Sequence, residues 1–211
     1  MTSMTRPPCS CVILAGGESK RLDGENKAFI EIGGKRVIER LLAVLRPLFS
    51  EIILVTNDPL AYLEWDVMMV TDHFNCRSSL TGIHAGIFAA ANPHAMVVGC
   101  DMPFIQPGML ETLLSAIEPH LDVIIPKTPH GFEPMMAIYS KRCLKPMEAA
   151  LVKKQFKILK VFRQVRVKEI EEAQLRRHDP DLISFININT PAQLASAEKW
   201  VQRRGSQKKR P

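Results

Sequence analysis

The sequence lacks the long apolar run that a membrane-spanning helix requires, because no uninterrupted stretch approaches about 20 apolar residues. The apolar stretch at residues 11–15 is also too brief for the core of a signal peptide. The 11 glycines and 15 prolines follow no repeat, which excludes collagen-like and low-complexity proteins. Hydrophobic residues make up 46% and charged residues 24% of the 211 residues, which argues against wholesale disorder. We therefore expect a soluble, cytoplasmic protein with no membrane partner.

Aromatic residues are scarce, at 6%, whereas nucleic-acid-binding proteins usually interleave basic residues with stacking aromatics. The formal net charge is +6, from 28 Lys and Arg against 22 Asp and Glu. Five of the basic residues lie within residues 203–211, which contain no acidic residue, so the rest of the chain is almost neutral. We interpret residues 203–211 as a basic, disordered tail and expect no nucleic-acid partner.

Clustered metal ligands are also missing. The five cysteines are scattered, and the pair Cys9 and Cys11 has one intervening residue rather than the spacing of a zinc site. The six histidines form no two-His motif. We expect reduced, mostly buried thiols and no structural zinc.

Alternation of strands and helices dominates the first two thirds of the chain. Apolar, β-branched runs predict strands at residues 10–15, 51–56, 67–70, 95–100 and 121–126. Helical spacing, small residues or a helix-opening proline predict helices at residues 37–48, 81–91 and 107–119. This order predicts an α/β fold: a single three-layer domain with an open, mostly parallel sheet flanked by helices.

The last third follows a less regular pattern. Residues 135–139 read as a strand that is antiparallel or at an edge, and residues 153–177 are charged and irregular. A late strand is predicted at residues 184–187. A capping box predicts a helix starting at Thr190, with Gly205 as its stop. No linker interrupts the chain, so one domain over residues 1–211 is expected.

The segment after the first strand suits a polyphosphate. Gly16 and Gly17 allow a sharp turn that brings backbone amides close to an anion, and Arg21 and Lys27 add positive charge. The alternative is an ordinary surface loop. The segment is neither a Walker A loop nor a GxGxxG dinucleotide fingerprint. A second glycine pair, at residues 33–34, is interpreted as a turn.

Four segments together resemble a known family. They are Leu14-Ala15-Gly16-Gly17 with Arg21 and Lys27, Ser79-Leu80-Thr81-Gly82-Ile83, Gly99-Cys100-Asp101-Met102-Pro103-Phe104, and Phe185-Ile186-Asn187-Ile188-Asn189-Thr190-Pro191. The first resembles the signature loop of small nucleotidyltransferases with a GT-A-like fold. The set resembles the molybdenum cofactor guanylyltransferases, the MobA family, over about residues 12–200.

The resemblance implies roles for particular residues. Those that would bind GTP are Leu14, Ala15, Gly16, Gly17, Lys27, Asn57, Asp72, Gly82 and Asp101. Those that would act in catalysis are Arg21, Lys27 and Asp101, with Asp101 holding Mg²⁺. Those on the pterin side would be Asn187 and Asn189.

Several of these roles also make chemical sense without the family. Asp101 follows a buried strand, where open α/β sheets place their ligands, and a lone carboxylate there suits Mg²⁺ held partly by substrate phosphates. Asp72 could accept from the N1–H and the exocyclic amine of guanine. The alternatives are capping roles: Asp101 for the helix that follows, Asp72 for a loop, and Asn57 for residues 58–64.

The sequence departs from the family pattern at several positions. Leu22 and Asp23 replace the usual Met-Gly, and Asp23 adds a negative charge beside a phosphate site, where it could also be a second metal ligand. Asn26 replaces the usual Asp before the lysine. The residues at 78–79 replace Gly-Pro, and the segment at 131–134 lacks a histidine.

The sequence predicts transfer of GMP from GTP to the terminal phosphate of molybdopterin, releasing pyrophosphate. The expected partners are GTP and molybdopterin, with molybdenum-insertion proteins or molybdoenzyme chaperones as further candidates. The alternatives are a cytidylyltransferase for the same cofactor, a sugar-phosphate nucleotidyltransferase, and a non-catalytic nucleotide-binding or cofactor-binding protein.

Overall fold

The structure is a computed structural model that describes residues 8–16, 26–72, 74 and 76–207, with side chains described up to residue 203. Within these residues, no helix is both long enough and apolar enough to cross a membrane.

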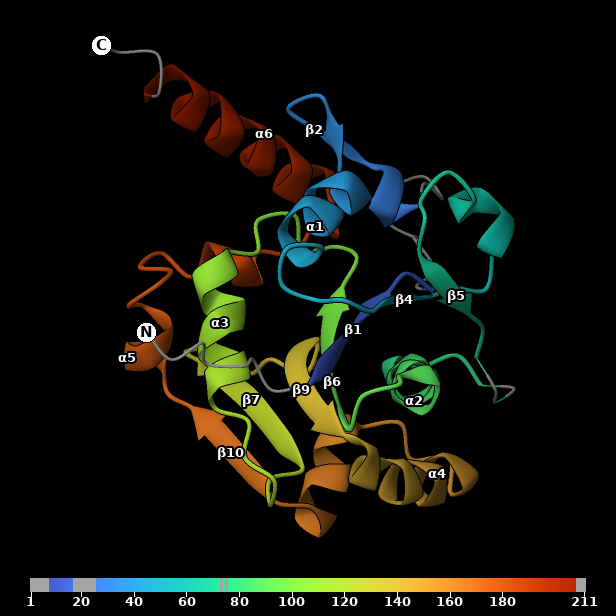
Figure 1. Cartoon of the computed structure of the whole chain (residues 1–211). Coiled ribbons are helices and arrows are strands. Elements are labelled where there is room, and N and C mark those ends of the chain that lie inside the picture. The colour runs from blue at the N-terminus through green and yellow to red at the C-terminus, as the bar shows by residue number, and fades with distance from the viewer. Residues whose placement is uncertain (1–7, 17–25, 73, 75, 208–211) are drawn as a thin grey trace.

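An eight-stranded, mostly parallel sheet runs through the molecule (Figure 1). Its strands lie in the order β10 (Val167–Ile170), β7 (Val123–Thr128), β9 (Met136–Ser140), β6 (His94–Gly99), β1 (Cys9–Leu14), β4 (Ile52–Val55) and β5 (Met68–Val70), with β8 (Gly131–Phe132) paired to β7. The hairpin of β2 (Glu31–Ile32) and β3 (Lys35–Arg36) turns at Gly33 and Gly34, as expected, and both glycines have positive φ.

Helices cover both faces of the sheet, which confirms the three-layer α/β fold (Figure 1). One face carries α1 (Val37–Leu45), α3 (Pro107–Ser115), α5 (Glu172–Leu175) and α6 (Pro191–Gln207). The other carries α2 (Ser79–Ala89), α4 (Leu144–Val152) and the 3-10 segment Ile158–Gln164. Shorter 3-10 turns are Lys27–Phe29, Pro59–Tyr62, Lys141–Cys143 and Ile183–Phe185.

Strand β1 shows why the sheet is buried on both faces. Cys11 and Ile13 point into one core, whereas Val12 and Leu14 point into the other, as the two-residue period of a strand requires. On the second face α2 lies close against β1, because Gly86 has no side chain: a Cβ there would lie 2.3 Å from Cγ1 of Val12. This close packing fixes the position of α2 over the central strand.

The strand predicted at residues 135–139 was expected to be either antiparallel or at an edge of the sheet. It is antiparallel, and it does not lie at an edge. Strand β9 pairs with β6 on one side and β7 on the other, and all five of its residues are buried. The edge is formed by β10, which lies in the segment expected to be irregular. The adjacent charged residues Lys168 and Glu169 obscured this strand, whose edge position leaves Glu169 exposed.

The late strand predicted at residues 184–187 is wrong. The segment begins as a 3-10 turn, Ile183–Phe185, because both oxygens of the Asp179 carboxylate accept from backbone amides, of Ile183 at 3.0 Å and of Ser184 at 2.7 Å. These bonds hold the backbone in a turn, although the side chains are β-prone.

The final helix starts after Thr190, as predicted, and the Thr190 hydroxyl accepts from the amide of Gln193 at 3.2 Å. The predicted stop at Gly205 is wrong, because α6 continues to Gln207 and so includes residues 203–207 of the expected disordered tail. One glycine costs a helix about 1 kcal/mol, which does not end it without a left-handed cap.

Candidate active site at the carboxyl edge of the sheet

Four neighbouring parallel strands end level with one another. Leu14 of β1 is paired with Gly99 of β6 and with Val55 of β4, and Val55 is paired with Val70 of β5. Each strand is followed, two positions after its paired residue, by a residue that sequence analysis selected. These residues are Asp101 after β6, Gly16 after β1, Asn57 after β4 and Asp72 after β5. Strand register therefore brings together four residues that are widely spaced in the sequence.

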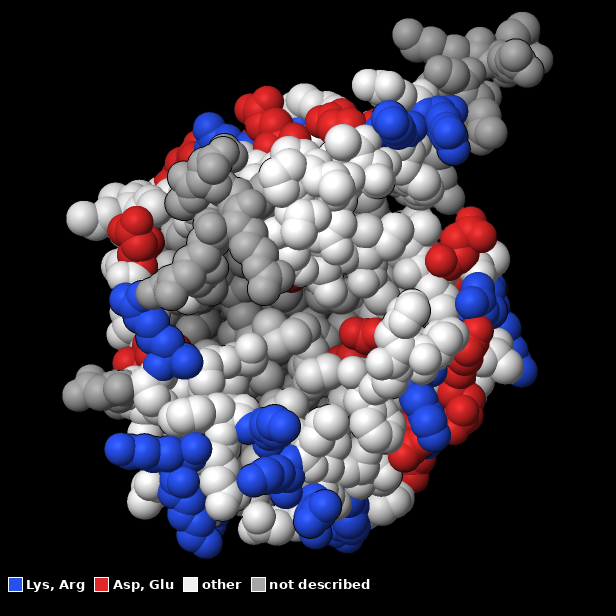
Figure 2. Space-filling view, turned by 180° about the vertical axis from the view of Figure 1, so that it is seen from behind, with Lys and Arg blue, Asp and Glu red and all other residues white. Residues whose placement is uncertain are grey.

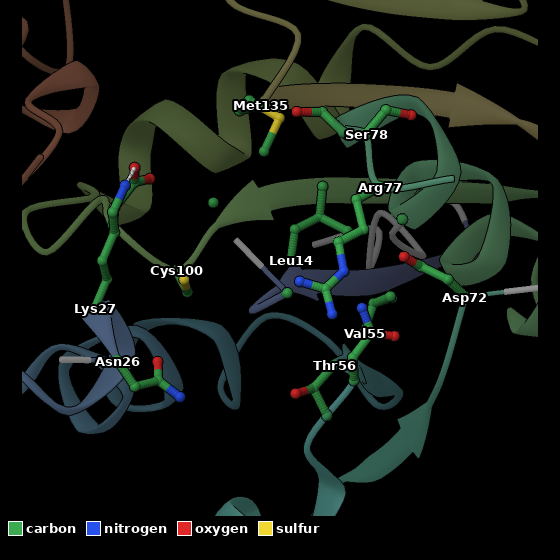
Figure 3. A pocket seen from close by; sticks show the side chains of 16 residues that line it. Leu14, Asn26, Lys27, Val55, Thr56, Asp72, Arg77, Ser78, Cys100 and Met135 are labelled. Atoms are coloured by element: carbon green, nitrogen blue, oxygen red, sulfur yellow. Dashed lines mark hydrogen bonds and ion pairs between the residues drawn. The ribbon is translucent and has the colours of Figure 1, made fainter. Parts of the chain in front are cut away.

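All four line one cavity of about 430 Å³, a size within the usual range for small-molecule sites. It lies where the strand order reverses about β1, the place where open α/β sheets bind ligands. Figure 2 shows a hollow in the face of the molecule opposite to that in Figure 1, and Figure 3 shows the cavity from close by. The remaining lining residues are Leu14, Asn26, Lys27, Val55, Thr56, Arg77, Ser78, Ser79, Gly82, Gly99, Cys100 and Met135.

Lys27, which Figure 3 shows at one end of the cavity, forms a charged pair with Asp101. The ammonium nitrogen of Lys27 lies 3.4 Å from Oδ2 of Asp101, and each side chain is about one fifth exposed. Lys27 also donates to the side-chain oxygen of Asn189. A cation and a carboxylate that share a polar, partly open site can serve a phosphate and its counter-ion.

The neighbours of Lys27 explain its position. Asn26 caps the 3-10 turn that begins at Lys27, with its side-chain oxygen accepting from the amide of Ala28 at 3.1 Å. The Asn26 amide donates to the hydroxyl of Tyr62 at 2.9 Å, and Phe29 packs on Tyr62 with ring centroids 4.9 Å apart. The Tyr62 hydroxyl can also donate to the side-chain oxygen of Asn26, at 3.1 Å, so this side chain ties the turn before Lys27 to Tyr62.

Asp101 does not cap a helix, because α3 begins only at Pro107. Its carboxylate occupies space that any side chain at position 99 would take, since a Cβ on Gly99 would lie 2.8 Å from Oδ1 of Asp101. The carbonyl of Asp101 accepts from the amide of Ile188 at 2.9 Å, which brings the Asn187–Asn189 segment to the cavity.

The opposite end of the cavity is polar as well. Asp72 and Arg77 line it (Figure 3). Asn57 also lines the cavity, two positions beyond β4, and does not cap the next turn, whose flanking residue is Asp58. Gly82 on α2 leaves room here, because a Cβ at this position would lie 3.3 Å from Leu14 and 3.8 Å from Oδ1 of Asp72.

Cys100 lines the cavity but does not offer a nucleophile. Burial raises the pKa of its thiol to about 12, so the sulfur stays protonated at neutral pH. In the described part of the chain no His lines this cavity, and no three His, Cys, Asp or Glu side chains form a group that could hold a metal. The described groups can bind and orient charged ligands, and none of them is set up for covalent catalysis.

Most of the expected site residues meet at this cavity: Leu14, Gly16, Lys27, Asn57, Asp72, Gly82 and Asp101. Ala15 is buried and does not line the cavity, and Asn189 accepts a hydrogen bond from Lys27. Asn187 is not among the lining residues, and Gly17, Arg21 and Asp23 lie outside the described residues.

Sequence reasoning missed Thr56, Arg77 and Met135 as cavity residues. It noted Ser78 only as a departure, although serine is a helix-capping type of residue. The Ser78 hydroxyl does cap α2, accepting from the amide of Thr81 at 3.2 Å. The capping preference of serine at position 78 could have predicted that α2 begins at residue 79. Arg77, which precedes the cap, would then have been a candidate site residue.

Comparison with known proteins agrees with this geometry. A family model described as MobA-like NTP transferase domain matches residues 11–170. A molybdenum cofactor guanylyltransferase of Desulfosudis oleivorans is 42% identical over 191 residues, covering 90% of this chain and 95% of that protein. A probable molybdenum cofactor guanylyltransferase of Natranaerobius thermophilus is 34% identical, covering 91% and 96%.

A solved structure shares the fold over the same extent. The molybdopterin-guanine dinucleotide biosynthesis protein A of Archaeoglobus fulgidus superposes with a TM-score of 0.81 at 29% identity, covering 92% of this chain and 99% of that one. Together with the match of the family model and the extent of the sequence identity, this shows that the chain belongs to the MobA-like NTP transferase family.

Proposed function

We propose that this protein transfers GMP from GTP to the terminal phosphate of molybdopterin, forming molybdopterin guanine dinucleotide and pyrophosphate. The names of the relatives supply the substrates. The observation that carries the proposal is the cavity itself, where the Lys27–Asp101 pair and the Asn57–Asp72 pair stand at opposite ends of one row of strand ends. A nucleotide has the matching polarity, with phosphates at one end and a base at the other.

The reaction needs positioning and charge more than acid–base chemistry. An oxygen of the acceptor phosphate forms a bond to the α-phosphorus, and the bond from that phosphorus to the β-phosphate oxygen breaks, so that pyrophosphate leaves with the electron pair. Because the attacking oxygen is already negative, no strong base is required, which agrees with the protonated Cys100. Lys27 stabilises the charge that develops, and Gly16 allows close approach of the phosphates. Arg21 has the same role as Lys27 in this proposal.

The donor set fits Mg²⁺. This ion is commonly held by one or two carboxylates together with substrate phosphates, and Asp101 presents one such carboxylate to the cavity. Asp101 would hold the ion, which, when bound, supplies positive charge against the phosphates. The proximity of Lys27 to Asp101 keeps the carboxylate turned toward the phosphate end of the cavity.

We place the acceptor on the β6 side of the nucleotide, where Asn189 meets Lys27, with Asn187 two positions earlier in the chain. A second cavity of about 430 Å³ shares Ser79 and Met135 with the first. Its basic residues are Lys157, Lys160 and Arg163. Phe156 and Ile158 add an apolar wall. This combination suits a planar ring that carries a phosphate.

The five free thiols agree with work in a reducing cytoplasm, where we place the reaction. Molybdenum-insertion proteins and molybdoenzyme chaperones remain candidate partners.

Incubation of the protein with GTP, Mg²⁺ and molybdopterin should release pyrophosphate, and the dinucleotide should be visible by mass spectrometry. Parallel reactions with CTP and with a sugar phosphate as acceptor test the alternatives. Turnover with CTP or the sugar phosphate but not with GTP and molybdopterin would contradict the proposal. Tight GTP binding without pyrophosphate would favour the non-catalytic alternative.

Replacing Lys157 with Ala should raise the KM for molybdopterin several-fold, since a charge-assisted contact to phosphate contributes about 1.5–3 kcal/mol when partly buried and less in this open cavity. The Kd for GTP, measured by calorimetry, should not change. Lys145→Ala on the exposed face of α4 is the matched control. An unchanged KM in Lys157→Ala would place the acceptor elsewhere.

A further inference from the structure

Arg77 lies at the base end of the cavity, although no motif of the sequence singles it out. Figure 3 shows its guanidinium reaching into the cavity near Leu14 and Val55, on the same side as Asp72. Lys27 and Asp101 stand at the other end, beyond β1 and β6. The cavity therefore has two cationic side chains among its described residues, with apolar Leu14 and Val55 in its wall.

The residues on either side of Arg77 are held by hydrogen bonds to one buried residue. The hydroxyl of Thr81 donates to the carbonyl of Cys76 at 3.0 Å, and the hydroxyl of Ser78 accepts from the amide of Thr81 at 3.2 Å. Thr81 is fully buried in α2. Arg77 is thus anchored between two tethered neighbours, so its long side chain starts from a defined position at the rim of the cavity.

The chemistry of Arg77 and Asp72 together matches guanine. A carboxylate can accept from the N1–H and the exocyclic amine, whereas a guanidinium can donate in a bidentate manner to O6 and N7. Adenine offers a donor in place of O6, and cytosine lacks this pair of acceptors. An acidic and a basic side chain at one end of the cavity can therefore recognise two edges of the same base.

We propose that Arg77 is a specificity-determining residue, whose guanidinium recognises the O6 and N7 edge of guanine while Asp72 recognises the edge that carries N1. The inference rests on the proposed function, because it assumes that the cavity takes a guanine nucleotide. It adds a contact that explains how a base is selected in a cavity whose central wall is apolar.

Nucleotide analogues test the two edges separately. In 7-deaza-GTP a C–H replaces N7, so the wild-type protein should bind it about tenfold more weakly than GTP. Arg77→Ala should bind GTP and 7-deaza-GTP with equal Kd, and Arg77→Lys should lose most of the discrimination while keeping the charge. ITP lacks the exocyclic amine, so Arg77→Ala should still distinguish GTP from ITP through Asp72. Isothermal titration calorimetry with Mg²⁺ gives all of these values.

The outcomes separate this inference from the proposed function. Equal binding of GTP and 7-deaza-GTP by the wild-type protein would overturn the role of Arg77. The role would also be overturned if Arg77→Ala, compared with the wild-type protein, bound GTP and 7-deaza-GTP more weakly by the same factor. That result would indicate that Arg77 contacts a phosphate. Preference for CTP over GTP would instead overturn the proposed function. Lys145→Ala controls for the loss of an exposed positive charge, and circular dichroism controls for folding.

Discussion

Replacing Asp101 with Asn is expected to reduce turnover by about a hundredfold or more without unfolding the protein. Asn has nearly the same volume, and the hydrogen bond that the Asp101 carbonyl accepts from the amide of Ile188 involves only the backbone. The substitution removes the negative charge that pairs with Lys27 and that would hold Mg²⁺. Loss of comparable electrostatic stabilisation of a transition state costs about 3 kcal/mol or more.

The measurement is initial rate across a Mg²⁺ titration, with circular dichroism to confirm folding. Asp66→Asn is the matched control, because Asp66 is exposed and does not line the nucleotide cavity. Lys27→Ala should behave differently from Asp101→Asn and weaken GTP binding as well as turnover, since Lys27 is the cation at the phosphate end. Near-normal turnover in a folded Asp101→Asn protein would move the metal elsewhere, and Asp23 would be examined first.

Gly86→Ala should lower the free energy of unfolding by about 2 kcal/mol, although alanine is the better helix former by about 1 kcal/mol. The new Cβ would lie 2.3 Å from Cγ1 and 2.9 Å from Cγ2 of Val12. Val12 is fully buried in the central strand and β-branched, so it cannot rotate out of the way. Helix α2 must move away from the sheet instead.

Thermal and urea unfolding measure this effect, with an expected fall in Tm of about 4–8 °C. Gly82→Ala is a matched control one turn earlier in α2, where the shortest contact of the Cβ would be 3.3 Å, to the flexible end of Leu14, and its contacts with Asp72 and Val55 would be ordinary ones at 3.8 Å. It should leave stability within about 0.5 kcal/mol and weaken GTP binding. Equal stability of the two variants would contradict the close packing of α2 on β1.

Much of the fold is encoded locally. The continuous apolar runs predict β1, β4 and β6 to within one or two residues, because a parallel strand covered on both faces must be apolar along its whole length. The same runs fix where the strands end, and the residues that follow include Gly16, Asn57 and Asp101. Parallel strands end at one edge, so these residues converge whatever the details of packing.

The tertiary structure decided what depends on distant partners. Strand β9 lies inside the sheet because it pairs with both β6 and β7. The charged segment β10 forms a strand because β7 supplies its hydrogen-bond partners. The turn at Asp179 replaced a strand that side-chain propensity alone favours.

Arg77 and Asn189 enter the site for the same reason: α2 and the chain before α6 are placed by contacts made far away in the sequence, including Gly86 on Val12 and Ile188 on Asp101. Hydrophobic period and strand ends are properties of short segments, and the sequence determined them by itself. Pairing partners and the walls of a cavity depend on long-range packing, which no short segment contains.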